Sequence, residues 1–299
     1  MRWWKLLLGV IIVSAVAVWG LGPGGHSSTD GTAPPPRPVP TPAASSTADV
    51  PVATGVPGVL KPKANPEFSA TFTGSTLDTS LWSTCYPGFD QSGCTNFGNP
   101  YTEREWYLPS QVVVSGGLLH LVAQQAPTPG KTASGSATTY ACRSGMVTTY
   151  PAFQFEYGYI QVVAKIPTSA GLWPALWLAA SDLKWPPEMD LLETWGGSKL
   201  IASTWFHYTT PSGNGQVQGP ITPAIRAAGW HTFALSWTRS QMTWLLDGRV
   251  IMTVRQHVPH QKMYFLADLA EWITRSRPNV TASECNGSLL ISSVKVWKA

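Results

Sequence analysis

From residue 68 onward, apolar side chains recur at every second position in short runs, which turn-forming residues separate. This alternation is typical of strands with one buried face. The strand-like run at 111–115 is followed by Gly116 and Gly117 and then by a second run at 118–123. The run at 242–246 is followed by Asp247 and Gly248. Both patterns predict a hairpin. No long amphipathic helix is evident. About 230 residues of short strands favour an all-β fold, a two-sheet sandwich of jelly-roll type.

The first 65 residues have a different character. Arg2 and Lys5 precede an uncharged, mostly apolar run at residues 6–21. This run is longer than a usual signal-peptide core and shorter than a free-standing membrane span. We interpret residues 1–22 as a signal peptide or a retained membrane anchor. Residues 23–65 hold ten prolines and no aromatic residue, so we expect a disordered, extended linker. The sequence thus predicts a secreted or extracytoplasmic protein with one domain at 66–299, tethered to a membrane or cell wall if the leader is retained.

Charge and hydrophobicity exclude two classes of protein. Asp, Glu, Lys and Arg make up 12% of the chain, about half the usual share, and the net charge is +4. A nucleic-acid binder normally carries a clustered basic face, and none is present. The hydrophobic fraction of 43% is too high for a disordered protein. The chain also holds 15 tryptophans, which need an explanation.

The four cysteines all lie in the predicted domain. An even number in an exported chain indicates disulfides. Cys85 and Cys94 close a short loop that contains proline and glycine, so we pair them, and Cys142 pairs with Cys285 by elimination. A zinc site is the competing interpretation, but the sequence has no C-x-x-C pair with nearby histidines, and we expect no metal.

Three acids stand within six residues of an otherwise apolar strand. Buried carboxylates are costly, so they are candidates for function. Glu188 and Asp190 share one face of a strand, whereas Glu193 would point to the other. A β-bulge at Leu191 and Leu192 would return Glu193 to the face of Glu188. The alternative is a strand edge with three solvent-facing acids.

Two glutamates on one face suit double displacement at a glycosidic bond. A retaining glycosidase needs two carboxyl groups about 5–5.5 Å apart. One must be ionised to attack the anomeric carbon, and the other must hold a proton for the leaving oxygen. Repulsion between Glu188 and Glu193 would separate their pKa values, and Asp190 between them could stabilise that separation.

The neighbouring residues make the pattern more specific. The run G-L-W-P-A-x-W at residues 171–177, the W-P pair at 185–186 and E-x-D-x-x-E at 188–193 resemble glycoside hydrolase family 16, in the bulged branch that includes laminarinase-type β-1,3-glucanases. Residues 72–82, 106–109, 155–158, 237–248 and 293–297 follow in the family's order. The resemblance implies a concanavalin-like β-jelly-roll with an open cleft on its concave sheet. It implies Glu188 as nucleophile, Glu193 as general acid/base and Asp190 as the residue that assists them.

Sugar-binding residues are less well marked. Indole rings suit the apolar C–H faces of sugars, although tryptophan also serves as core. The resemblance places a cleft histidine near residue 207, although this histidine could instead be packed at the surface. Charged loop residues near 103 could bind sugar or could simply be solvated. The expected substrate-binding residues are Trp173, Trp177, Trp195, Trp205, His207, Glu103 and Arg104. Trp237 and Trp244 are expected in the core.

Departures from the family leave the polysaccharide open. Thr102 stands where the family often has Asn before the Glu, Tyr159 replaces the Arg of Y-G-R, and Asp268 begins a segment that in laminarinases reads N-L-A-x-G-G. We expect an exported retaining endo-glycosidase that acts on β-1,3- or mixed β-1,3-1,4-glucan. The alternatives are the same chemistry on a galactan such as agar, a transglycosylase, or a non-catalytic polysaccharide-binding module.

The expected partner is a polysaccharide rather than a nucleic acid, and the protein is expected to be a monomer. No cofactor is expected. A structural calcium ion occurs in parts of the family, but no dense acidic loop marks a site for one in this sequence.

Overall fold

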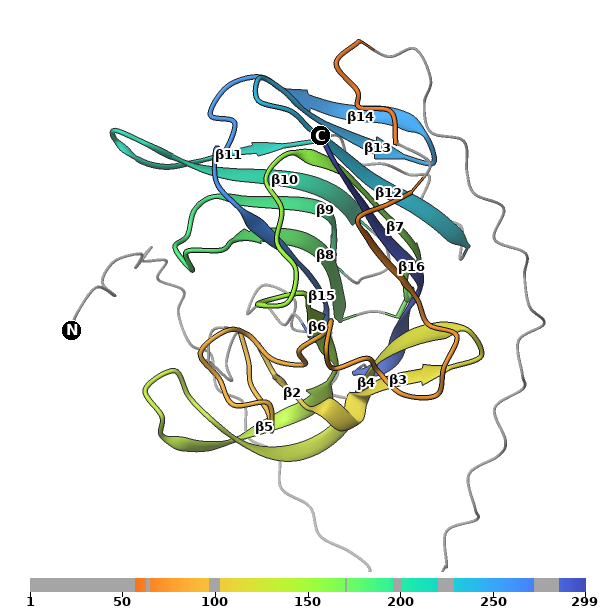
Figure 1. The fold of residues 1–299 in the computed structure, drawn as a ribbon. Coiled ribbons are helices and arrows are strands. Elements are labelled where there is room, and N and C mark those ends of the chain that lie inside the picture. Colours follow the sequence, from red (N-terminus) through yellow and green to blue (C-terminus); the bar gives the residue numbers. More distant parts are fainter. Residues whose placement is uncertain are drawn as a thin grey trace, which may run out of the picture. The chain divides into compact units, whose positions relative to one another are not determined.

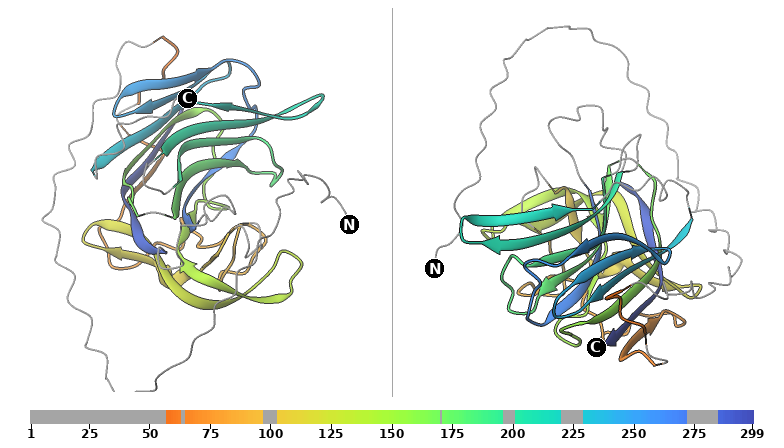
Figure 2. Two further views of the ribbon diagram at one scale, coloured as in Figure 1. Left: turned by 180° about the vertical axis from the view of Figure 1, so that it is seen from behind. Right: turned by 90° about the horizontal axis from the view of Figure 1, so that it is seen from above.

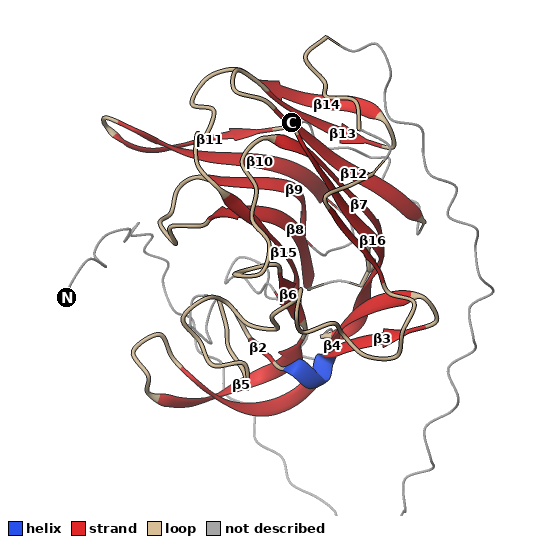
Figure 3. Ribbon diagram, in the orientation of Figure 1, coloured by secondary structure: helices blue, strands red, loops and turns tan. Residues whose placement is uncertain are grey.

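The computed structural model describes residues 57–62, 65–96, 103–169, 171–195, 201–219, 229–271 and 285–299. Within these ranges the regular structure consists of strands and one short 3-10 helix, η1 (Pro109–Gln111) (Figure 1, Figure 3). Among these residues, no helix has the length and apolar character that a membrane crossing needs. The predicted leader at 1–22 and the predicted linker up to residue 56 lie outside the described residues.

The first sheet has ten strands in the described chain. Its main path runs through β14 (Arg249–Val254), β13 (Met242–Leu246), β12 (Trp230–Trp237), β7 (Gly158–Lys165), β16 (Asn286–Lys298), β4 (Leu118–Lys131), β5 (Ala137–Ser144) and β2 (Glu105–Tyr107). Two further strands join it, since β1 (Phe68–Thr71) pairs with β16 and β3 (Val112–Ser115) pairs with β4. Neighbours are antiparallel except for the parallel pair of β2 and β5.

The second sheet has six strands, all antiparallel to their neighbours within the described residues. Its order is β11 (Gly213–Gln218), β10 (Ile201–Thr210), β9 (Glu188–Trp195), β8 (Leu172–Ala180), β15 (Met263–Glu271) and β6 (Met146–Thr148). The strand with the three acids, β9, therefore lies inside this sheet and has a partner on both sides.

A single large apolar cluster joins the inner faces of the two sheets. Ile160 and Phe233 come from the ten-stranded sheet, and Leu178, Met189 and Phe206 come from the six-stranded sheet. Alternate residues of these strands point away from the cluster, as the period-2 pattern predicts. The two layers, seen from behind and from above in Figure 2, form the expected β-jelly-roll sandwich. We call the face of each sheet that points away from this cluster its outer face.

The two tryptophans that were expected in the core are there. Trp237 and Trp244 are both fully buried. The two predicted hairpins are also present. Gly116 and Gly117 join β3 to β4, and Asp247 and Gly248 join β13 to β14. All four have positive φ, between 48° and 76°, which explains why turn-forming residues stand there.

The end of the predicted linker contacts the domain. Residues 57–62 fall within the range 23–65, yet the Leu60 N–H donates a hydrogen bond of 2.8 Å to Ser236 Oγ on β12. Val59 and Leu60 pack beside Tyr159, Ala234 and nearby residues on the outer face of the ten-stranded sheet. Contact with the domain thus begins before residue 66, because these apolar side chains have an apolar surface to cover.

The cysteines are bonded in the pairs that the sequence suggested. Cys85 joins Cys94, and Cys142 on β5 joins Cys285 just before β16. All four are buried. None is therefore a thiolate available to a metal ion.

Candidate active site

A β-bulge interrupts β9. On the β8 side, Leu192 pairs with Leu176 and Asp190 pairs with Trp177, so Leu191 is an additional residue without a counterpart. On the β10 side the register also shifts, between the partners of Glu193 and Asp190. The bulge thus lies at the two leucines, as predicted from the spacing of the acids.

The bulge decides which side chains face outward. Leu191 and Leu192 are both buried in the main core cluster, with 2% and 1% exposure. Because two consecutive residues pack inward, Glu193 returns to the outer face that carries Glu188 and Asp190. The three acids therefore share one face of the six-stranded sheet.

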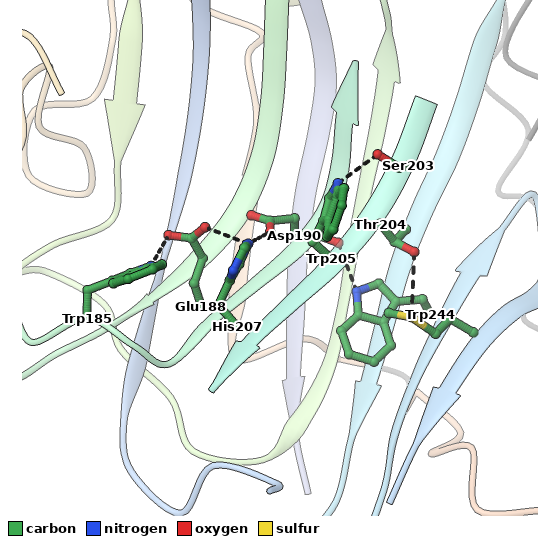
Figure 4. A network of polar contacts seen from close by, with 9 residues as sticks. Trp185, Glu188, Asp190, Ser203, Thr204, Trp205, His207 and Trp244 are labelled. Carbon is green, nitrogen blue, oxygen red and sulfur yellow. Dashed lines mark hydrogen bonds and ion pairs between the residues drawn. The ribbon is translucent and has the colours of Figure 1, made fainter. Parts of the chain in front are cut away.

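Two aromatic side chains approach the first acids from neighbouring segments (Figure 4). His207 of β10 is the register partner of Glu188, and its Nε2 lies 3.6 Å from Glu188 Oε1 and 3.7 Å from Asp190 Oδ2. The Trp185 indole N–H donates a hydrogen bond of 3.1 Å to Glu188 Oε2 from the loop before β9. Glu188 thus has a hydrogen-bond donor on one oxygen and an imidazole beside the other.

The backbone of the strand is held from the core side. The fully buried Trp244 on β13 donates its indole N–H to the carbonyl oxygen of Asp190 at 2.9 Å. This bond crosses from one sheet to the other, next to the bulge. It fixes the position of Asp190 without using its carboxyl group.

Burial and mutual repulsion raise the proton affinity of the three acids. Loss of water, followed by the charge of Glu193, raises the pKa of Glu188 to about 8, against the opposing Trp185 hydrogen bond. Burial and then Asp268 raise the pKa of Glu193 to about 7, while Trp173 favours its charged form. Burial, with Glu188 and Glu193, also raises the pKa of Asp190.

The pKa of His207 shifts in the opposite direction to those of the acids. Burial lowers the pKa of His207, because the imidazolium loses water on entering the site. Near neutral pH the neutral imidazole is thus favoured, and it can exchange a proton or hydrogen bond with the neighbouring carboxyl groups.

A fourth carboxyl group faces this region from β15. Asp268 is the register partner of Ala175 on β8, and Ala175 is the partner of Glu193 on β9. Asp268 accepts hydrogen bonds from the Trp177 indole at 2.7 Å and from the Tyr107 hydroxyl at 3.2 Å. Burial nevertheless raises its pKa to about 7. From the sequence, Asp268 stands out only as a departure from the family, and it was not predicted to lie at the site.

Several of the expected sugar-binding residues lie on the same outer face. Trp173 and Trp177 on β8 are half-buried. Trp177 is the register partner of Asp190 on β9, and Asp190 is in turn the partner of Trp205 on β10. The Trp205 and His207 rings are stacked with centroids 6.1 Å apart. The side chain of the remaining predicted tryptophan, Trp195, lies outside the described part of the structure.

Two expected residues are placed differently. Glu103 is buried, with 1% exposure, and accepts a hydrogen bond from Thr95 Oγ1, so its side chain is not available to a sugar. The Arg104 guanidinium lies 4.0 Å from the buried carboxylate of Glu271. The expectation that Glu103 binds substrate is therefore corrected: this acid faces the interior, beside the buried Glu105.

Conversely, Trp185 belongs to the W-P pair of the family-like motif but was not predicted as a site residue. It is 57% exposed, it contacts Glu188, and its ring lies 5.6 Å from that of His207. Its place three residues before Glu188 was the available signal.

The described residues contain two groups of side chains with the proximity that a metal ion needs. One is Glu271 with Cys142 and Cys285, whose sulfurs are already joined in a disulfide. The other is Glu188, Asp190 and His207, which are two carboxyl groups and the imidazole of the candidate site itself.

Curated proteins are similar to this chain in sequence. An endo-1,3-1,4-beta-glycanase of Rhizobium meliloti (strain 1021), ExsH, is 29% identical over an alignment of 204 residues that covers 64% of this chain and 42% of that protein. A second one from the same organism, EglC, is 30% identical over 207 residues, with the same shares of the two chains. The chain therefore spans about two fifths of the length of these curated relatives.

Solved structures share the fold. The crystal structure of LamAcat from Zobellia galactanivorans superposes with a TM-score of 0.65 at 22% identity and covers 79% of this chain and 98% of that one. The two-sheet sandwich is therefore the fold of that structure as well. Residues 110–277, more than half of the chain, match the model of glycosyl hydrolases family 16, and the chain belongs to this family.

Proposed function

We propose that the protein is an exported, retaining endo-glycosidase that hydrolyses β-1,3- or mixed β-1,3-1,4-linked glucan by double displacement. One observation carries the proposal: Glu188 and Glu193 share the outer face of a bulged strand, and both have a strongly raised pKa. Such groups in a family of glycosyl hydrolases suit the exchange of a proton near neutral pH. The names of the two curated relatives support a glucan as substrate.

The neighbours of the two glutamates suggest their roles. In the first step, the Glu188 carboxylate attacks the anomeric carbon while Glu193 gives its proton to the leaving glycosidic oxygen. In the second, Glu193 takes a proton from water, which attacks the same carbon and releases Glu188. Glu188 faces the Trp185 N–H and His207, which stabilise an anion, whereas Glu193 faces the carboxyl group of Asp268, which favours a protonated neighbour.

In the free protein, both pKa values are raised, to about 8 for Glu188 and about 7 for Glu193. Repelling carboxyl groups titrate as a pair, so a proton that leaves one group is readily taken up by the other. The first step then proceeds from the arrangement in which the proton lies on Glu193. The Trp185 hydrogen bond stabilises this arrangement, because it favours the ionised form of Glu188.

Indole rings would bind the polysaccharide on either side of these acids. Trp173 and Trp177 line β8, Trp205 lies on β10, and the exposed Trp185 precedes β9. Flat rings of this kind stack on sugar faces, and their N–H groups offer hydrogen bonds. We infer that the polysaccharide binds in a cleft along this outer face and is cut at internal bonds.

Export and tethering rest on the sequence of residues 1–65. We infer that the apolar run at 6–21 directs export and either is cleaved or anchors the protein in the membrane. Leu60 packs on the outer face of the ten-stranded sheet, opposite the acids, so a tether would approach the domain from the side away from the substrate. Fractionation of cells that produce the full chain tests this, and protein confined to the cytoplasm would contradict it.

The test of activity is a screen of soluble laminarin, lichenan, agarose and xyloglucan with the wild-type protein, Glu188→Ser, Glu193→Gln and Glu67→Gln. Glu67 is an exposed residue paired with Lys298 and serves as the control. We expect new reducing ends from laminarin or lichenan with the wild-type protein and Glu67→Gln. Glu188→Ser should abolish hydrolysis and retain binding to the polysaccharide. Proton NMR should show the β-anomer as the first product, as retention requires.

Each alternative has its own signature in this screen. Activity on agarose alone would reject the glucan and favour a galactanase, and products longer than the substrate would show transglycosylation. Binding of laminarin without any reducing ends would favour a non-catalytic module. Near-normal turnover by Glu188→Ser would reject the nucleophile.

A further inference from the structure

Asp268 stands in the same row of the six-stranded sheet as Glu193. The row runs from Asp268 on β15 through Ala175 on β8 to Glu193 on β9 and Ser203 on β10. Residues that pair across neighbouring strands share a face, so both carboxyl groups lie on the outer face. The residue between them is an alanine, whose methyl group is too small to separate the two.

The carboxyl group of Asp268 is held in one orientation. One oxygen accepts the Trp177 indole N–H at 2.7 Å and the other accepts the Tyr107 hydroxyl at 3.2 Å. Asp268 is 5% exposed, and Tyr107 is fully buried. The bond to Trp177 also fixes the rotation of an indole that we expect to bind sugar.

We propose that Asp268 is a positioning residue for the reaction, which fixes the Trp177 indole beside the substrate and places a partly ionised carboxyl group opposite Glu193 so that Glu193 remains protonated until the leaving oxygen takes the proton. This inference rests on the proposed function. It adds a residue on a different strand to the three acids of β9. Asp268 need not touch the sugar, because it acts through Trp177 and through its charge.

The electrostatic surroundings agree with this role. After burial, Asp268 is the leading cause that raises the pKa of Glu193, whereas for Glu188 and Asp190 other nearby groups come before it. The two donors, Trp177 and Tyr107, favour the ionised form of Asp268. The titratable groups that face Asp268 or Glu193 from the packed elements are Tyr86, Glu103, Glu105, Tyr107, Glu188 and Asp190. Of these, burial and the nearby acids raise the pKa of Tyr107 well above 10, so its hydroxyl stays a neutral donor.

The test is Asp268→Asn, which keeps the shape and one acceptor oxygen but removes the charge. The first readout is the pH titration of the Glu193 carboxyl carbon by 13C NMR, assigned by its absence in Glu193→Gln. We expect the midpoint to fall by about 0.5 to 1 pH unit, the effect of a partly ionised carboxylate two strand spacings away. Asp182→Asn removes an exposed carboxylate two residues after the end of β8 and should leave the midpoint unchanged.

The second readout is the pH profile of kcat. Its basic limb, where Glu193 loses its proton, should shift to lower pH in Asp268→Asn, by the same amount as the NMR midpoint. Trp177→Phe removes the N–H donor, so it should raise KM and move the limb less. If Asp268→Asn does not fold, Trp177→Phe and Tyr107→Phe still test the inference, because a weaker donor set raises the pKa of Asp268 and so lowers the midpoint of Glu193.

The two proposals fail separately. If the wild-type protein hydrolyses none of the polysaccharides, the proposed function fails, and the NMR titration still decides whether Asp268 acts on Glu193. A folded Asp268→Asn protein with unchanged Glu193 titration and unchanged kcat profile would overturn the role of Asp268, even if the enzyme is active. A loss of stability with no change in either profile would show a merely structural residue.

Discussion

Deletion of Leu191 removes the one residue of β9 that has no counterpart on β8. In the shortened strand, the remaining leucine keeps Leu176 as its partner, and Asp190 and Glu193 keep theirs on β8 and β10. Because residues 191 and 192 are both leucine, deletion of either gives the same chain. We expect a regular strand with all three acids still on the outer face, since Glu193 moves from the fifth to the fourth position after Glu188.

The magnitude follows from the side chain that is lost. Leu191 is 2% exposed within the main core, and removal of a buried leucine side chain destabilises by about 2–5 kcal/mol. At about 2–4 °C per kcal/mol for a domain of this size, a loss near 3 kcal/mol lowers Tm by roughly 6–12 °C. Leu191→Ala keeps the bulge and loses a similar volume, so the two variants should have Tm values within a few degrees of each other.

Thiol labelling reports the face directly. The four native cysteines are in disulfides, so a new thiol in Glu193→Cys is the group that reacts. It should be labelled at similar rates with and without Leu191, whereas Met189→Cys, which is buried on the inner face, should be protected. A protected residue 193 in a folded deletion variant would refute the reasoning. Failure of the deletion variant to fold, with Leu191→Ala folded, would refute it as well.

Two further predictions concern stability. Because burial raises the pKa of Glu188 from 4.5 to about 8, the folded protein binds more protons than the unfolded one between these values, and the free energy of unfolding should decrease as pH rises from about 5 to 8. Glu188→Gln should flatten this decrease in thermal unfolding, and an unchanged slope would contradict the shift. The Cys142–Cys285 bond spans 143 residues and Cys85–Cys94 spans 9, so paired serine substitutions should destabilise by about 2 kcal/mol more at the longer bridge. Urea unfolding measures the difference, and equal losses would argue against the loop-entropy explanation.

Local patterns were sufficient for much of the fold and for the acidic strand. The period-2 alternation places residues on one of two faces without any knowledge of the neighbouring strands, so the odd spacing of Glu193 required a bulge. The hairpin at Asp247 and Gly248 was predictable for a similar reason, because few residues adopt the positive φ that both positions have. In each case the constraint lies within a few residues of sequence.

The rest depends on the order of strands in the sheets. Asp268 meets Glu193 only because β15 lies beside β8 and β8 lies beside β9, although 268 − 193 = 75 residues separate the two in sequence. Asp268 was missed from the sequence, whereas Glu103 was predicted to bind sugar from an expected loop but is buried in the structure. Burial of an acid is unfavourable by itself, so local reasoning favours exposure, and only the packed neighbours supply the compensating contacts.

The bulge reconciles two demands that fall on the same short strand. The outer face of β9 must hold acids in a partly dehydrated site, and their raised pKa values show that this placement is unfavourable for the charged forms. The inner face must anchor the strand to the other sheet. Two consecutive inward leucines place additional apolar surface between Asp190 and Glu193, and the Trp244 hydrogen bond holds the same point of the backbone. These inner contacts hold the backbone between Asp190 and Glu193, which keeps the acids at a fixed spacing against their mutual repulsion.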